Sequence, residues 1–411
     1  MYGCSFRSIS TSGPLMNVGS EKVRKNVSKI FDLELKELKE KKLLRKPVCI
    51  ESSHGPKIVI NGKTYTDYSS NDYLNLSEHP AVIKAAANAL KNMTLGSGAS
   101  RLLSGTYTSH KLLEKRIAKF KGTQSAVLFN SGYSANTGII PALTDKETLI
   151  LSDELNHASI IDGTRISRAT VKVYRHCDLE HLKLLLKKGH TDRRFKKLMV
   201  VTDTVFSMDG DIAPLDVINT LCEKYDAFLM IDEAHATGVI GDTGRGGLEY
   251  YGIRSKRIIQ MGTLSKAFGC YGGFTACTKE IEELLVSRAR SFIYSTSLPP
   301  ALCEAGIKAI DVVEKRSKGL REKLWKNRDR LFNGLNDLGY NTLYSETPII
   351  PVVVGSTKDA LKMAKRLYRE MIFVPAIRPP TVTEGKCRLR FSVTSGHTNE
   401  DIDHALEILS K

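Results

Sequence analysis

The sequence predicts an α/β protein built on a mostly parallel β-sheet, followed by a smaller α+β domain. Between residues 76 and 300, short apolar runs recur, most of them separated by segments of helical character. Near-continuous apolar strands between helices are typical of a parallel sheet that is covered on both faces. After Pro299-Pro300 the pattern changes to a long helical stretch followed by a few strands. This change indicates a second domain over residues 301–411.

The N-terminal region is expected to contain a tail, a helix and a hairpin. Residues 1–20 are rich in Ser and Thr and are interpreted as a disordered tail, since a single arginine is a weak signal for a transit peptide. Residues 21–46 have apolar side chains at helical spacing among many charges. Two short strands flank Asn61-Gly62, a pair typical of a type I′ hairpin turn. The helix and hairpin form a segment, residues 21–75, ahead of the large domain.

Helices and strands alternate through the large domain, residues 76–300. A helix opens at Pro80, and a second covers residues 108–121 and stops at Gly122. The predicted strands are residues 126–129, 148–151, 171–174, 198–201, 227–231, 258–261 and 274–277. Since ligands of parallel sheets bind at the carboxyl ends of the strands, functional residues are expected there.

The C-terminal domain is predicted to be less regular. It begins with a long helix over residues 300–338 and continues with a strand at 349–354 and a helix at 357–371. Strands are also expected near 372–377 and at 387–393.

Composition excludes several classes of protein. Of the 411 residues, 41 % are hydrophobic and 26 % are charged, which is typical of globular proteins. No apolar run approaches the ~20 residues of a membrane span. The eight cysteines form no C-x-x-C motif and are interpreted as reduced, buried thiols of a cytoplasmic protein. No metal site is predicted. The net charge of +16 favours anionic partners, namely nucleic acid, phosphorylated cofactors or an acidic carrier protein.

Asp232 ends an apolar strand and opens the string Asp232-Glu233-Ala234-His235. A helicase acidic box has this form but requires an upstream G-x-x-x-x-G-K-[ST] loop, and the only G-K-[ST] here has Lys57 where the first glycine should be. The alternative pairs Asp232 with Lys266, which follows the next strand among small and hydroxyl residues. Such a lysine can form a Schiff base with pyridoxal 5′-phosphate (PLP), while the carboxylate keeps the pyridine nitrogen protonated.

Other strand ends carry groups that suit the same cofactor. Gly132 and Tyr133 open a helix after a strand, where free N–H groups favour a phosphate, although a plain strand-to-helix turn would look the same. His157 follows another strand and could stack on the pyridine ring, or simply cap a helix. Ser207 and His235 also follow strands and could face the cofactor.

Five strings, in this order, resemble the α-oxoamine synthases, which are PLP-dependent enzymes of the aspartate-aminotransferase fold (fold type I). The strings are Ser69-Ser70-Asn71-Asp72-Tyr73-Leu74, Leu155-Asn156-His157-Ala158-Ser159, Val205-Phe206-Ser207-Met208-Asp209-Gly210, Asp232-Glu233-Ala234-His235-Ala236-Thr237-Gly238 and Gly262-Thr263-Leu264-Ser265-Lys266. The similarity extends from about residue 45 to residue 410, and Glu233 departs from it, because relatives often have Asp there. This family condenses an amino acid with an acyl thioester and releases carbon dioxide.

The resemblance implies roles for individual residues. Catalytic roles fall to Lys266, which carries the Schiff base and takes the α-proton, and to Asp232, His157 and His235. The cofactor would be bound by Gly132, Tyr133, His157, Ser207, Asp232, His235, Thr263 and Lys266. Substrates would be bound by Arg45, His157, Thr381 and Arg390, with Arg390 holding the amino acid carboxylate through a bidentate fork. Ser295-Thr296 would reach the phosphate of a second copy, which implies a homodimer with shared active sites.

One further string narrows the reaction. Ala376-Ile377-Arg378-Pro379-Pro380-Thr381-Val382, followed by Arg388-Leu389-Arg390, resembles family members of biotin synthesis that condense L-alanine with a pimeloyl thioester. The acyl carrier would be coenzyme A (CoA) or acyl carrier protein. The alternative within the family condenses glycine with acetyl-CoA, and the alternative outside catalysis is a basic nucleic-acid-binding protein.

Overall fold

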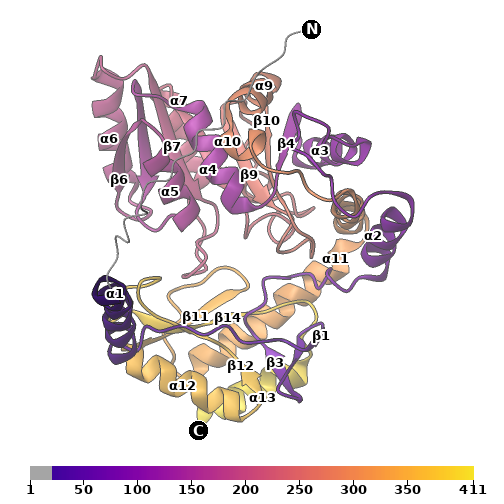
Figure 1. The fold of residues 1–411 in the computed structure, drawn as a ribbon, viewed down its shortest axis with the longest axis vertical. Helices are drawn as coiled ribbons and strands as arrows, with labels where there is room; N and C mark the ends of the chain where they lie inside the picture. The colour runs from indigo at the N-terminus through magenta and orange to yellow at the C-terminus, as the bar shows by residue number, and fades with distance from the viewer. Residues whose placement is uncertain (1–20) are drawn as a thin grey trace, which may run out of the picture. The chain divides into compact units, whose positions relative to one another are not determined.

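The computed structural model describes residues 21–411 (Figure 1). These residues belong to two compact units that divide between Val48 and Cys49. The tail predicted for residues 1–20 lies outside the described residues, as does Cys4. The first unit contains helix α1 (Glu21–Glu40). This helix is shorter than the predicted 21–46, because Lys42 adopts a left-handed φ of 56° and the chain turns back, with the Leu43 N–H donating to the Leu38 carbonyl.

A seven-stranded sheet forms the centre of the second unit, and all seven predicted strands are present in it. They are β4 (Ser125–Phe129), β5 (Thr148–Asp153), β6 (Thr170–Tyr174), β7 (Lys197–Asp203), β8 (Phe228–Asp232), β9 (Ile258–Thr263) and β10 (Gly273–Cys277), in the order β4-β10-β9-β8-β7-β5-β6. Only β10 runs antiparallel to its neighbours. The other six strands therefore end at one edge, called the carboxyl edge below.

Helices cover both faces of this sheet. The helices of this part of the chain are α2 (Pro80–Asn92), α3 (Thr108–Lys121), α4 (Gly132–Leu143), α5 (Ala158–Ile166), α6 (Leu179–Thr191), α7 (Leu215–Lys224), α8 (Gly247–Tyr250), α9 (Lys279–Arg288) and α10 (Arg290–Ile293). Alternate strand residues enter opposite clusters: Ile150 packs with α4, α5 and α9, whereas Leu149 and Leu151 pack with α6 and α7. Burial of both faces explains why the strands are apolar almost throughout.

Two smaller sheets complete the unit. Strands β1 (Ser52–His54), β2 (Lys57–Ile60), β3 (Lys63–Asp67) and β12 (Ile372–Phe373) form one, and β11 (Ile349–Gly355), β14 (Cys387–Ser392) and β13 (Ala376–Ile377) form the other. The predicted β2–β3 hairpin is confirmed, with Asn61 and Gly62 at φ of 50° and 70°. The strand region expected near 372–377 is confirmed. It divides at Pro375, which has no N–H for either ladder, into β12 on β3 and β13 on β14.

Three C-terminal helices connect these sheets: α11 (Pro300–Asp337), α12 (Thr357–Arg369) and α13 (Asn399–Ser410). Helix α11 packs against α2 and α3 with its first half and against α13 with its second (Figure 1). Tyr68 is completely buried in the same apolar cluster as Leu331 of α11 and Phe391 of β14. The predicted domain boundaries near residues 75 and 300 stay predictions.

Across residues 21–411, no helix is both long and apolar enough to cross a lipid bilayer. The seven cysteines in this range are all unpaired. Four of them, Cys222, Cys277, Cys303 and Cys387, are buried, whereas Cys49 is exposed.

Candidate active site

The carboxyl edge gathers the ionisable residues that the sequence singled out. Asp232 is the last residue of β8, and Asp203, the last residue of β7, lies directly beside it in the parallel register. His157 precedes α5 just after β5, and Lys266 lies in the loop after β9. The four groups are close enough to influence one another's charge.

Neutral donors orient the Asp232 carboxylate. Its Oδ2 accepts a 2.8 Å hydrogen bond from Asn136 Nδ2 of α4, and its Oδ1 accepts one of 2.9 Å from the Ala234 N–H. Asn136 also donates to Ser159 Oγ at 2.8 Å, while its own Oδ1 is buried without a hydrogen-bond partner. No cation within the described chain forms an ion pair with Asp232, so its negative charge is available to a ligand.

The surroundings of Lys266 favour a neutral amine. Burial lowers the pKa of Lys266 to about 8, against the opposing attraction of Asp232, and the positive charge of Arg390 lowers it further. In the part of the chain that the structure covers, Nζ of Lys266 has no hydrogen-bond or ion-pair partner. A half-buried amine of this kind is a nucleophile and a base near neutral pH.

His157 is fixed by its position at the start of α5. Its ring Nδ1 accepts a hydrogen bond from the Ser159 main-chain N–H at 3.2 Å. The main-chain N–H of His157 donates to Asp203 Oδ2 at 2.7 Å. Desolvation lowers the pKa of His157, and Lys266 lowers it further although Asp232 opposes this. Burial, followed by repulsion from Asp232, raises the pKa of Asp203 well above its usual range. The lowered pKa of His157 means that its imidazole is neutral at neutral pH.

A helix start faces the same edge. Ser131 caps α4 by accepting the Ser134 N–H at 3.1 Å. The first-turn N–H groups of Gly132 and Tyr133 have no intrahelical acceptor and suit a phosphate. A Cβ on Gly132 would lie 3.7 Å from Cβ of Thr263, so the end of β9 borders this turn. The Tyr133 side chain points elsewhere, since its hydroxyl donates to Asp162.

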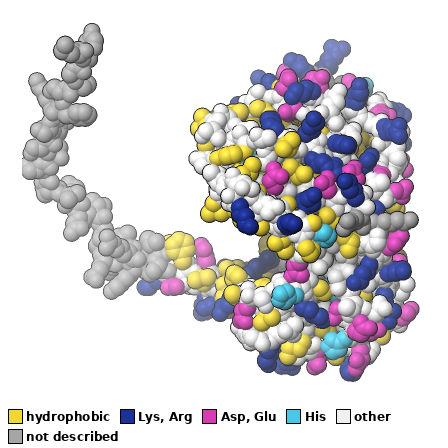
Figure 2. All heavy atoms as spheres, turned by 90° about the vertical axis from the view of Figure 1, so that its right-hand side faces the viewer, with side chains coloured by type: hydrophobic (Ala, Val, Ile, Leu, Met, Phe, Trp, Pro, Cys, Tyr) yellow, Lys and Arg dark blue, Asp and Glu magenta, His cyan; other side chains and the backbone are white. Residues whose placement is uncertain are grey.

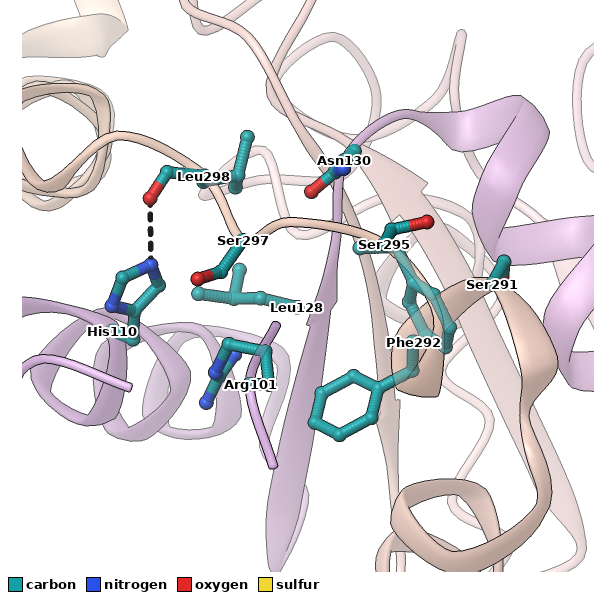
Figure 3. A pocket seen from close by; sticks show the side chains of 10 residues that line it. Arg101, His110, Leu128, Asn130, Ser291, Phe292, Ser295, Ser297 and Leu298 are labelled. Atoms are coloured by element: carbon teal, nitrogen blue, oxygen red, sulfur yellow. Dashed lines mark hydrogen bonds between the residues drawn. The ribbon is translucent and has the colours of Figure 1, made fainter. Parts of the chain in front are cut away.

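A small pocket lies behind this helix start (Figure 3). Ser295 and Asn130 line it, and Asn130 Nδ2 donates to the Thr296 carbonyl at 2.8 Å. His110 closes its other side through a 2.8 Å hydrogen bond to the Leu298 carbonyl (Figure 3). Its volume of about 10 Å³ holds one water molecule at most, so this pocket is not a cofactor site.

A hydrogen-bond network reaches the edge from β14. Arg390 donates to the side-chain oxygen of Asn71 from both Nη1 and Nη2, at 3.2 Å each, and from Nε to the Ser207 carbonyl. His235 is buried, with Nδ1 2.7 Å from the Tyr73 hydroxyl, and burial lowers the pKa of His235 well below its usual range. Asn71 and Tyr73 were missed as site residues, although the Ser69–Leu74 string that contains them was a usable signal.

Two further residues, Thr381 and Arg45, are predicted to bind substrate. Thr381 is exposed in the loop between β13 and β14, where its N–H donates to the Arg378 carbonyl. Arg45 follows α1 in the first unit, which is described separately. Their expected contacts with substrate stay predictions.

The chemistry of this group of residues fits PLP. Among the described residues, it offers an amine without a hydrogen-bond partner, a carboxylate without a paired cation, an imidazole beside them and a helix N-terminus for a phosphate. Bound PLP supplies an electron-withdrawing ring that stabilises negative charge on the α-carbon of an amino acid. The fold and the site together define a PLP-dependent enzyme of fold type I.

Comparison with known proteins supports this class and narrows it. The sequence model of the aminotransferase class I and II family matches residues 63–409. An 8-amino-7-oxononanoate synthase from Thermoanaerobacter pseudethanolicus is 45 % identical over 94 % of this chain and 98 % of the relative. The chain therefore belongs to the aminotransferase class I and II family, within its α-oxoamine synthase branch.

Solved structures agree. A PLP-bound serine palmitoyltransferase from S. paucimobilis is 31 % identical, with a TM-score of 0.87 over 93 % of this chain and 97 % of that one. An 8-amino-7-oxononanoate synthase from Francisella tularensis is 30 % identical, with a TM-score of 0.73 over 84 % and 97 % of the two chains.

Proposed function

We propose that this protein joins L-alanine to a pimeloyl thioester and so produces 8-amino-7-oxononanoate, carbon dioxide and a free thiol, in biotin synthesis. The observation that carries the proposal is the meeting of Lys266, Asp232 and His157 at one sheet edge, in a chain that is 45 % identical to an 8-amino-7-oxononanoate synthase. Several further relatives with that name are 43–46 % identical.

Each residue of the site receives a proposed task. Lys266 binds PLP covalently through its ε-amine and moves the α-proton of the amino acid, which a pKa near 8 suits. Asp232 holds a proton on the pyridine nitrogen. His157 stacks on the ring, and Ser207 and His235 face its oxygen substituent.

Further residues bind the phosphate and the substrates. The N–H groups of Gly132 and Tyr133, with the Thr263 hydroxyl, bind the phosphate. Arg390 exchanges its contact with Asn71 for the carboxylate of L-alanine, and Arg45 and Thr381 contact the acyl substrate.

The proposed assembly is a homodimer with shared active sites, in which Ser295-Thr296 of one copy reaches the phosphate of the other. The exposed side chains of Leu95 and Leu103, each 80 % accessible, support a covering partner, because apolar side chains of this size gain stability when they are buried. The test is mixing: a Lys266→Ala chain and a Thr296→Arg chain, each inactive alone, should regain activity together. If the mixture regains no activity, the result would contradict a shared active site.

The alternatives are not favoured. None of the relatives named above is called a glycine-dependent ligase. A nucleic-acid-binding protein would be expected to have its Lys and Arg side chains clustered in a basic patch. On the face that Figure 2 shows, the described Lys and Arg side chains are mixed with Asp and Glu. The unpaired cysteines support a reducing compartment such as the cytoplasm.

The deciding experiment is a mass-spectrometric assay of amino acid and thioester pairs. We expect L-alanine with a pimeloyl thioester to give a higher kcat/KM than glycine with acetyl-CoA. Each methylene buried in an apolar groove contributes about 0.8 kcal/mol, and pimeloyl has several that acetyl lacks. Equal kcat/KM for the two pairs would overturn the proposed substrates but leave the family assignment unchanged. Assays with CoA and carrier-protein thioesters would identify the carrier.

A further inference from the structure

His176 lies between two carboxylates next to the site. Its Nδ1 is 2.9 Å from Asp153 Oδ1, and its Nε2 is 2.9 Å from Asp211 Oδ2. Burial alone would lower the pKa of His176, but the hydrogen bonds to Asp153 and Asp211 outweigh burial and raise the pKa to about 12. The ring is therefore an imidazolium at neutral pH and donates from both nitrogens. We call these three residues the His176 bridge.

On one side, the bridge holds the end of β5. Asp153 is the last residue of β5 and is 2 % exposed. Its Oδ1 also accepts the Leu155 N–H at 2.9 Å, and its carbonyl accepts the Asn156 N–H at 3.3 Å. The next residue is His157. The carboxylate that binds His176 thus shapes the turn that places the proposed stacking residue.

On the other side, the bridge holds the loop after β7, residues 204–214. The Asp211 carbonyl accepts the Phe206 N–H at 3.1 Å, and the His176 ring contacts Phe206 edge to face at a centroid distance of 4.4 Å. Ser207 is the residue after Phe206, and its carbonyl accepts a hydrogen bond from Nε of Arg390. The same loop is tied to β14 a second time by the ion pair between Asp209 and Arg388.

We propose that His176 is a positioning residue, which links the segment that carries His157 to the loop that carries Ser207 and orients Arg390. The inference rests on the proposed function for the tasks of those three residues. We therefore expect that losing the hydrogen bonds of the His176 bridge weakens the binding of PLP and of the amino acid carboxylate together, because both depend on the position of the 204–214 loop. Binding of the acyl thioester should be unaffected.

A metal ion is the competing interpretation of this cluster. Asp153, His176 and Cys177 lie close enough together to hold one, and Asp211 could orient the imidazole from behind. The geometry favours the bridge, because both ring nitrogens lie 2.9 Å from carboxylate oxygens, which is the distance of a direct hydrogen bond. In addition, the Cys177 N–H already donates to Asp153 Oδ2 at 3.0 Å.

The test compares variants of the purified holoenzyme with wild type. His176→Phe keeps the contact with Phe206 but loses both hydrogen bonds, and His176→Gln keeps a neutral donor in case the first variant folds poorly. His190→Phe is the matched control, because His190 also contacts an aromatic ring, Tyr225, but lies at the far end of α6 and bonds only a main-chain carbonyl. PLP affinity and the absorbance change on adding L-alanine are measured without any thioester.

Loss of a charged hydrogen bond should weaken PLP and L-alanine binding by about tenfold each in His176→Phe and less in His176→Gln. The KM for the thioester should stay within about twofold of the wild-type value. Adding Asp211→Asn to His176→Phe should weaken PLP and L-alanine binding little further, since the two residues act as one unit. The proposal would be overturned if His176→Phe bound PLP and L-alanine as tightly as His190→Phe does. One tightly bound zinc ion per chain in wild type would also overturn it. If wild type does not respond to L-alanine, the proposed function fails, whereas the PLP measurement still decides the role of His176.

Discussion

Asp232 and Glu233 are adjacent in the sequence and both are buried, yet their carboxylates have opposite surroundings. Asp232 faces the carboxyl edge, and within residues 21–411 it accepts hydrogen bonds only from the neutral Asn136 amide and the Ala234 N–H. Glu233 faces away from that edge, forms an ion pair with the buried Lys121 and accepts the Gly247 N–H at 2.6 Å.

The difference separates two uses of a buried carboxylate. The charge of Glu233 is neutralised inside the protein by Lys121. The surrounding chain packs closely against Glu233, since a Cβ on Gly246, at φ of 103°, would lie 2.6 Å from Oε2 of Glu233. Within the described chain, the charge of Asp232 has no such match, and Lys266, whose amine it attracts, carries no hydrogen bond. An unmatched buried charge is costly unless a ligand completes it, which is what a binding site requires.

The largest effect should come from removing the amine on the Asp232 side. Lys266→Ala should lose turnover by about 10⁴-fold, because the proton-transfer group is gone. PLP should still bind, without a covalent bond, since the phosphate and ring contacts remain. Borohydride reduction followed by peptide mass spectrometry should label wild type at Lys266 only. The exposed Lys256→Ala is the control, and a label on another lysine would contradict the assignment.

The next effect tests Asp232 against its neighbour. Asp232→Asn should keep the fold and slow α-proton exchange by about 10³-fold, because an amide does not stabilise a positive pyridine nitrogen. Solvent deuterium exchange into L-alanine measures this. Glu233→Gln should leave the exchange rate of the folded protein within a few-fold of wild type. Similar losses in both variants would mean that the two carboxylates do not differ as their surroundings indicate.

Breaking the other pair should act on stability instead. Lys121→Met leaves Glu233 buried without its cation and should lower the free energy of unfolding by about 3–5 kcal/mol. Urea denaturation measures this, with the exposed Lys119→Met of the same helix as the control. A loss no larger than that of Lys119→Met would show that the pair is not needed for folding.

The smallest effect concerns pH. Since only the neutral amine attacks the PLP aldehyde, the rate at which apoprotein captures PLP covalently should rise with pH, about tenfold per unit, and level off above the Lys266 pKa of about 8. Stopped-flow absorbance between pH 6 and pH 10 measures this rate. A rate that still rises about tenfold per unit up to pH 10, as for an ordinary lysine, would show that the pKa of Lys266 is not lowered.

Much of the fold and of the site could be predicted from local sequence. The strands of the large sheet are apolar because both faces are covered, and the residues after β4, β5, β7, β8 and β9 meet because parallel strands end together. That geometry follows from the parallel direction of the strands, so the sequence alone predicts Asp232, Lys266 and His157 at one edge.

The remainder depends on long-range contacts that no local pattern records. Asn136 reaches Asp232 from a helix almost a hundred residues earlier, and Asn71 meets Arg390 from the other end of the chain. Asp203 ends a strand just as Asp232 does, but its raised pKa depends on burial beside that second carboxylate. The separation of β12 from β13 depends on which sheet edge lies nearest, which the alternation of apolar residues does not specify.

The position of β12 also has a consequence for synthesis of the chain. Strand β3 is made early, but the strand that pairs with its second edge through Ile372 and Phe373 comes nearly last. The seven-stranded sheet draws on one continuous stretch, β4 to β10, and can assemble in the meantime. On the ribosome, the edge of β3 therefore stays open while the rest of the unit folds. An open edge pairs readily with strands of other chains, so this hairpin is where a nascent chain of this protein most needs protection from aggregation.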